Sequence, residues 1–136
     1  MAGIIVNIDV PDVGLGRRFY EGGLGFEYSR SLFGGAVVEL AAESTTVYLI
    51  QHDVGSRPVQ GNPGTRDYSD HWTPVHLDVI VDDIDQALQR AIEAGARAVG
   101  EQQAREWGKL APLRDPFGHG VCLLQFSGPG YDLVQA

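Results

Sequence analysis

The sequence has a single cysteine, Cys122, no run of basic residues and no long apolar stretch. One cysteine excludes a disulfide within the chain. The 18 Asp and Glu outnumber the 10 Lys and Arg, and this formal net charge of −8 disfavours nucleic acid and anionic membranes as partners. No apolar segment approaches the roughly 20 residues that a transmembrane helix needs. The opening MAGIIVNIDV lacks a basic region typical of a signal peptide, so the sequence predicts a cytoplasmic protein.

What the sequence does contain is an internal repeat. The segment IIVNIDVPDVG aligns with VHLDVIVDDID, which begins at Val75, and the later segment VYLIQ aligns with VCLLQ. In each copy an apolar-rich strand precedes an aspartate, Asp12 or Asp83, that can cap a following helix. The repeat therefore predicts one structural unit used twice.

The helix of the second copy is the better defined. Its apolar residues recur with helical spacing and Gly95 follows as a C-terminal signal. The stripe consists of Ile84, Ala87, Leu88, Ala91 and Ile92. The helix of the first copy is weaker, because Gly14 and Gly16 each cost about 1 kcal/mol relative to alanine.

Short strand-like runs follow each helix, which predicts the order strand, helix and three strands in both copies. The expected strands are 26–31, 36–40 and 45–51 in the first copy, and 97–99, 106–113 and 120–126 in the second. We expect one domain, 1–136, made of a module 1–55, a linker loop 56–73, a module 74–128 and a tail 129–136. The linker is rich in Gly, Pro, Asp and Ser, as surface loops are.

Three segments carry a resemblance to a known family. The segments IDVPDVGLGRRFYEGGLGF and DVIVDDIDQALQRAIEAGA resemble the openings of the two modules of the vicinal oxygen chelate superfamily. This superfamily includes glyoxalase I, the bleomycin-resistance proteins and the extradiol dioxygenases. The segment RDPFGHGVCLLQF resembles its closing hairpin. The resemblance implies an α+β fold, with two βαβββ modules whose curled mixed sheets form a shared cleft.

The resemblance also implies where metal-dependent members place their ligands, which are usually His or Glu. Those positions hold Ile5, Tyr48, His76 and Cys122 in this chain. Isoleucine offers no lone pair, neutral tyrosine is a weak ligand, and a thiol suits hard catalytic ions poorly. We therefore expect no metal and no other cofactor; if a metal is bound, we expect His76 with Cys122 to hold it.

Strand periodicity predicts which side chains share the cleft face, with the two tryptophans as aromatic walls. The expected ligand-binding residues are Ile5, Asn7, Tyr48, Ile50, Trp72, Trp107, Cys122 and Leu124. His76 and Asp78, two apart on a strand, are the candidate catalytic pair, because a histidine beside a carboxylate can act as a general base. The alternative is that Asp78 bonds backbone or water and His76 is a satisfied cleft histidine.

The remaining candidates for chemistry have plain structural interpretations. Cys122 is either a nucleophile activated by His76 or a small buried hydrophobic residue. His119 is expected in the turn before the last strand, and His52 and His71 are expected in solvent beside the linker.

These observations leave three classes of function open. The first is a metal-independent cleft that sequesters a small, partly apolar organic molecule, as in the bleomycin-resistance branch, within a homodimer. The second is a lyase, isomerase or dioxygenase that uses His76 with Asp78, or a divalent metal. The third is a structural or partner-binding module.

Overall fold

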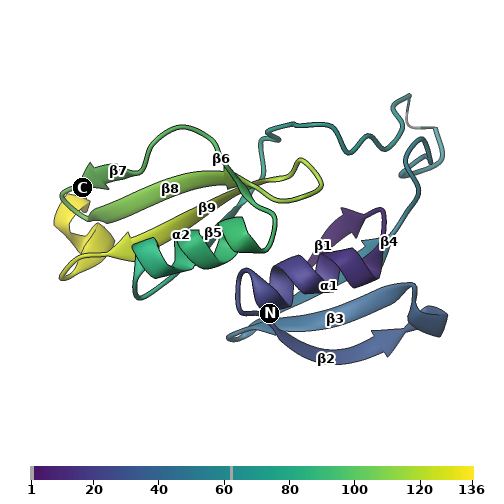
Figure 1. The fold of residues 1–136 in the computed structure, drawn as a ribbon, viewed down its shortest axis with the longest axis horizontal. Helices are drawn as coiled ribbons and strands as arrows, with labels where there is room; N and C mark the ends of the chain where they lie inside the picture. The colour runs from purple at the N-terminus through teal and green to yellow at the C-terminus, as the bar shows by residue number, and fades with distance from the viewer. Residues whose placement is uncertain (1, 62) are drawn as a thin grey trace. The chain divides into compact units, whose positions relative to one another are not determined.

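The computed structural model describes residues 2–61 and 63–136, and its contacts divide the chain into two units, residues 1–69 and 70–136. Each unit contains one α-helix and one mixed β-sheet (Figure 1). Within the described residues, no helix has both the length and the apolar character that a bilayer span requires. The α+β class and the repeated module are thus confirmed.

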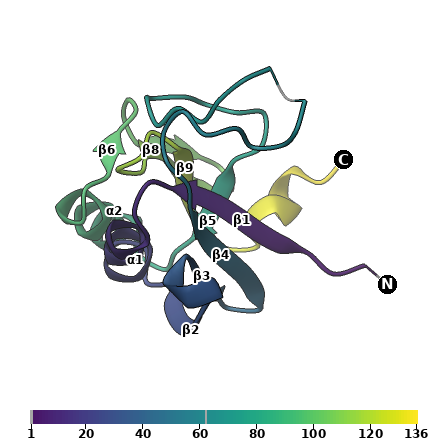
Figure 2. The same cartoon turned by 90° about the vertical axis from the view of Figure 1, so that its right-hand side faces the viewer.

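In the first unit the helix lies between the first and second strands in sequence. The elements are β1 (Ile5–Val10), α1 (Val13–Gly22), β2 (Glu27–Leu32), a 3₁₀ turn (Phe33–Gly35), β3 (Val37–Ala42) and β4 (Thr45–Gln51). The strand order is β1-β4-β3-β2, with β1 parallel to β4 and the other pairs antiparallel. Figure 2 views α1 end-on beside this sheet.

The second unit repeats this topology with one additional short strand. Its elements are β5 (Leu77–Ile80), α2 (Ile84–Glu93), β6 (Arg97–Ala98), β7 (Gln103–Arg105), β8 (Gly108–Arg114), β9 (Gly120–Phe126) and a 3₁₀ helix (Gly130–Val134). The order is β5-β9-β8-β6, with β5 parallel to β9 and β7 paired to β8. The sequence repeat is therefore a repeat of strand pairing.

The helices begin where the sequence predicted, and a second residue of each repeat explains why. The Asp12 and Asp83 carboxylates accept backbone N–H groups of the first helical turn at 3.0 to 3.1 Å. A glutamine at or next to the end of each last strand, Gln51 or Gln125, accepts the N–H of the first helical residue at 3.0 and 2.8 Å. These caps tie each helix to the strand that pairs with its first strand.

Two details of the second unit differ from the sequence-based expectation. Ile92, assigned to the buried stripe of α2, is 43% exposed. The strand expected over 106–113 is β8, which begins only at Gly108 because the chain turns at Glu106 and Trp107, and the short strand β7 before this turn was not predicted. Gly108 opens β8 so close to its neighbour that a β-carbon would lie 2.1 Å from the Gln125 carbonyl oxygen.

The expected linker 56–73 is attached at both ends. Within the first unit, the Arg66 guanidinium donates to the Asp9 carboxylate of β1 at 2.7 Å. Arg66 also exchanges backbone hydrogen bonds of 2.7 Å with Gly55 and Ser56. Arg66 therefore fastens the segment to β1 in the first unit, and residues 70–73 belong to the second unit.

The core of the first unit lies between α1 and one face of its sheet. Phe19 and Tyr20 from the helix are 1% exposed, and Leu49 of β4 is fully buried. Gly16 allows this close packing: a β-carbon there would lie 3.0 Å from the Leu49 Cδ1 atom and 3.4 Å from the Val10 methyl carbons. Gly16, which lowers the helix propensity of this segment, is thus the residue at which the helix packs closely on the sheet.

We predict that Gly16→Val destabilises the fold by about 1–3 kcal/mol, because its methyl groups overpack a core that has no space for them. The matched control is Gly22→Ala in the same helix, where a β-carbon meets no atom within 4 Å. That substitution should be neutral or stabilising by up to about 1 kcal/mol, since alanine is the better helix former. Urea unfolding measures both; equal destabilisation would contradict the close-packing interpretation.

Candidate functional site

The candidate site lies on the face of the second sheet that α2 does not cover. Leu113, Val121 and Leu123 are buried residues of β8 and β9 on the helix-facing side. Because strand side chains alternate, the residues between them point to the opposite face. The strand register aligns Asp78 of β5, Cys122 of β9 and Pro112 of β8 in one row across that face.

His76, Asp78 and Cys122 form a compact polar group on this face. The His76 Nε2 and Asp78 Oδ1 atoms lie 3.2 Å apart, so the structure brings together the two residues that were expected to act as a pair. The candidate ligand atoms of all three side chains lie within 4.8 Å of one another. His76 and Asp78 keep 34% and 42% of their side-chain surface exposed, which leaves them accessible to a small molecule.

The Cys122 thiol is a protonated hydrogen-bond donor in this group. Burial, the negative charge of Asp78 and a hydrogen bond to that carboxylate together raise the pKa of Cys122 to about 11. An activated nucleophile requires the opposite shift, toward the thiolate. The geometry therefore favours the interpretation of Cys122 as a buried, unreactive residue, 5% exposed.

Trp72 forms an aromatic wall beside this group. Its six-membered ring occupies the space where a β-carbon of residue 120 would stand, with Cε3 only 2.3 Å from that position. Gly120 begins β9 on the same face as Cys122, and the Trp72 and His76 rings have centroids 5.1 Å apart. Gly120 was missed from the sequence; a glycine opening a strand is the signal that indicates close approach of another group.

In the first unit, the expected cleft residues share one face of their own sheet. The register sets Asn7 beside Tyr48, and Glu39 of β3 beside Tyr48 on the other side. Arg30 of β2 donates to Glu39 at 3.2 Å, and this bond, aided by a hydrogen bond from Tyr48, lowers the pKa of the Glu39 carboxyl. Ile5 and Ile50 flank this polar row on the same face.

Arg30 and Glu39 were missed from the sequence. The tight turn between β3 and β4 pairs Ala42 with Thr45, and counting back along the hairpin places Glu39 opposite Tyr48. The register of this hairpin could therefore have predicted Glu39 as the neighbour of Tyr48.

Trp107 and Leu124, the other expected ligand-binding residues, lie further along the second sheet. Leu124 is 3% exposed on β9. Trp107 packs against Phe126 and Tyr131, with ring centroids 6.2 and 5.0 Å away. Trp107 is thus part of an aromatic cluster with the C-terminal segment, at the end of β9 opposite Trp72.

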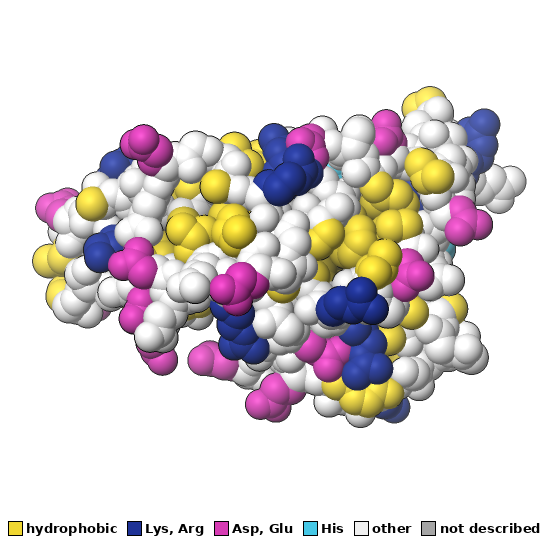
Figure 3. Space-filling view, in the orientation of Figure 1, with side chains coloured by type: hydrophobic (Ala, Val, Ile, Leu, Met, Phe, Trp, Pro, Cys, Tyr) yellow, Lys and Arg dark blue, Asp and Glu magenta, His cyan; other side chains and the backbone are white. Residues whose placement is uncertain are grey.

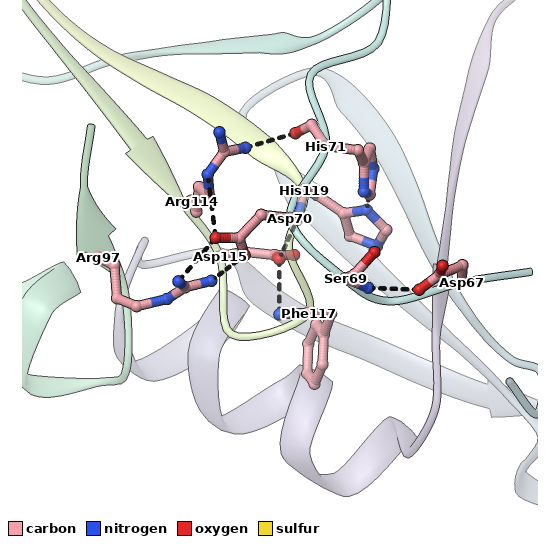
Figure 4. Close-up of polar contacts among 9 residues, drawn as sticks. All are labelled: Asp67, Ser69, Asp70, His71, Arg97, Arg114, Asp115, Phe117 and His119. Atoms are coloured by element: carbon pink, nitrogen blue, oxygen red, sulfur yellow. Dashed lines mark hydrogen bonds and ion pairs between the residues drawn. The ribbon is translucent and has the colours of Figure 1, made fainter. Parts of the chain in front are cut away.

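The expectation of a solvated His71 was wrong. Its Nε2 atom lies 3.0 Å from the Nδ1 atom of His119 (Figure 4). His119 lies in the turn between β8 and β9, as predicted. The pair was missed because 48 residues separate its members and no periodicity connects them.

The usual hard-metal site of the superfamily does not fit these residues. Ile5 has no donor atom, the Tyr48 hydroxyl bonds Glu39, and the Cys122 thiol keeps its proton well above neutral pH. Of the four positions, His76 alone offers an ordinary ligand. His76, Asp78 and Cys122 constitute a different donor set, softer because of the thiol.

The two helix-and-sheet modules have the fold of the vicinal oxygen chelate superfamily. Residues 5–124 match the model of the glyoxalase-like domain, so the chain belongs to this family. The chain is also similar to a glyoxalase/bleomycin resistance protein/dioxygenase family enzyme from Burkholderia phytofirmans, with 19% identity, a TM-score of 0.70 and coverage of 90% of this chain and 97% of that one. A hypothetical protein from S. aureus is 23% identical, with a TM-score of 0.68 and coverage of 92% of this chain and 97% of that one.

Curated relatives match a shorter stretch. Uncharacterized proteins of Mycobacterium bovis and Mycobacterium tuberculosis are 42% identical over 48 residues, which is 35% of this chain. The matched stretch covers 32% and 28% of those relatives, about a third of their length.

We predict that Cys122 makes folding stability fall as the pH rises. An unfolded cysteine loses its proton near pH 8.5, whereas the folded thiol holds it to about 11, so the folded state binds more protons between these values. The difference in unfolding free energy between the wild type and Cys122→Ser should shrink by about 2–3 kcal/mol from pH 8 to pH 11. Urea unfolding across this range measures the difference, and a constant difference would contradict the raised pKa.

Proposed function

We propose that the protein binds a small, partly apolar organic molecule on the β5–β9–β8 face, without the divalent metal of its metal-dependent relatives. The observation that carries the proposal is the Trp72 ring seated on Gly120 beside His76. A large aromatic side chain that stays 43% exposed next to accessible polar groups is typical of a small-molecule site.

The composition of this face supports a ligand with both apolar and polar parts. Ile80, two residues after Asp78 on β5 and therefore on the same face, is 67% exposed and supplies an apolar surface. The Asp78 carboxylate is an acceptor, so the polar part of the ligand is a hydrogen-bond donor. Figure 3 draws another face, the one with α2 in front of the second sheet, on which apolar patches lie between charged side chains of both signs.

The proposal includes two further expectations. The first is that the protein forms a homodimer, and sedimentation of the purified chain measures its mass in solution. Base catalysis by His76, oriented by Asp78, is the other, since their contact of 3.2 Å satisfies the geometric requirement for such a pair.

We predict that a screen of small planar organic molecules finds ligands that raise the melting temperature equally with and without EDTA. Gly120→Ala should weaken binding of such a ligand at least about tenfold, because its methyl group displaces the Trp72 ring from the site. Gly22→Ala, at an open helical position, is the matched control and should bind normally. Isothermal titration measures the affinities. Normal binding by Gly120→Ala would contradict the assigned wall, and the lack of any ligand would remove the proposal.

The second candidate is a metal-dependent enzyme, favoured by the closeness of His76, Asp78 and Cys122. Three protein ligands with one open position are the usual set of a catalytic zinc site. To bind here, a metal ion would have to displace the proton of the Cys122 thiol, as ions that bind thiolate strongly can do.

We predict that Co²⁺ titration of the metal-free protein distinguishes the two candidates. On the first candidate, no thiolate-to-cobalt absorption band develops at neutral pH, because Cys122 stays protonated. A stoichiometric band that disappears in Cys122→Ser and His76→Gln, but persists in the control His52→Gln, would establish the second candidate instead.

A further inference from the structure

The segment that carries Trp72 is fastened to the second unit by the two residues before it. The Asp70 carboxylate accepts from both terminal nitrogens of Arg97, one of them at 2.9 Å, and lies 3.6 Å from the Arg114 Nε atom. Arg114 also donates to the His71 carbonyl at 2.6 Å, and the His71 N–H donates to the Gly118 carbonyl at 3.1 Å. Figure 4 shows Asp70 between the two arginines.

The His71 and His119 rings add a contact that depends on protonation. Their nitrogens lie 3.0 Å apart, and the rings meet edge to face with centroids 4.9 Å apart. A hydrogen bond between two imidazoles needs one nitrogen as donor and the other as acceptor. The bond therefore exists when both rings are neutral or when they share one extra proton. It is lost when both rings are charged.

The turn that carries His119 is held more firmly than the segment that carries His71. The Asp115 carboxylate is fully buried and accepts the N–H groups of Phe117 and His119 at 2.8 and 2.9 Å. The Asp115 N–H donates in turn to the His119 carbonyl at 2.8 Å. The Arg97 and Asp70 side chains that fasten the segment of His71 are about half exposed, so repulsion between two charged rings acts mainly on that segment.

We propose that His71 and His119 form a proton-sensitive latch that positions Trp72 over Gly120, and that protonation of both rings opens it. Trp72 directly follows His71 in the chain, so displacement of His71 moves the aromatic wall. The latch itself is independent of the proposed function, and only its consequence for a ligand rests on that function.

The charged groups that contact the segment and the turn are of both signs. Asp70 on the segment and Asp115 in the turn are negative groups, and Arg97 of β6 and Arg114 of β8 are positive ones. His76, which precedes β5, adds a third imidazole next to Trp72. The controls of the test below therefore include His76.

The sign of the pH effect follows from proton binding. The closed latch admits at most one extra proton, whereas the open state admits two, so acid favours opening. Both groups are imidazoles, the side chain that most readily gains a proton near neutral pH. A falling pH therefore opens the latch and a rising pH closes it.

The test follows Trp72 fluorescence in a Trp107→Phe background, in which Trp72 is the one remaining tryptophan. As the pH falls from about 8 to about 5, we expect the acrylamide quenching constant to rise about twofold or more, with a red shift of the emission. In His119→Gln, whose amide both donates and accepts without titrating, this transition should disappear while far-UV circular dichroism shows the fold retained. If His119→Gln does not fold, His71→Gln is the equivalent variant.

Two control variants separate the latch from other titrations. His76→Gln removes the imidazole that contacts Trp72 and can quench it directly, and should keep the transition. His52→Gln, in the first unit, should also keep it. A transition that persists in both His119→Gln and His71→Gln, or one that vanishes in His76→Gln, would overturn the proposal, as would its absence from the parent protein. No ligand is used, so this result does not depend on that of the binding screen.

Discussion

In each unit the first strand pairs in parallel with the last, and this pairing determines which residues can act together. Parallel neighbours require a crossover connection, which here runs through a helix on one sheet face and then through the other strands of the unit. The register of β5 on β9 sets Asp78 beside Cys122 on the face that α2 does not cover. Glutamines at or next to the ends of β4 and β9 hold the helix starts to the same strands, so cap, crossover and site share one strand pair.

The sequence predicted this architecture well because its signals are local or repeated. Alignment of the two copies predicted the strand and helix order, and the Asp12 and Asp83 caps marked the helix starts. Boundaries failed where a close backbone approach mattered more than residue type. Trp107 is a residue type that favours strands, and the sequence placed it in one, yet it lies in a turn. The strand begins at the next residue, Gly108, where a side chain would collide with the Gln125 carbonyl.

The site was only partly predictable for the same reason. Alternation along a strand placed His76 with Asp78, and the structure joins them at 3.2 Å. Contacts between distant segments left no signal of their partners. A glycine at position 120 indicated a close approach without showing what approaches, and nothing in the sequence connected His71 with His119. These two contacts are also the ones on which the wall of the site depends.

The balance between proton and metal at Cys122 connects the chemistry of the site to its proposed use. With a pKa of about 11, removal of the thiol proton at pH 7 costs about 5 kcal/mol. A hard ion such as Mg²⁺ gains little from a thiolate and does not offset this cost; only an ion that binds thiolate strongly, with the other ligands also in place, can offset it. Without such an ion, the proton stays and the thiol donates to Asp78. The Asp78 carboxylate, still 42% exposed, can then accept a hydrogen bond from an organic ligand. The same protonated thiol is unsuited to hold a catalytic metal.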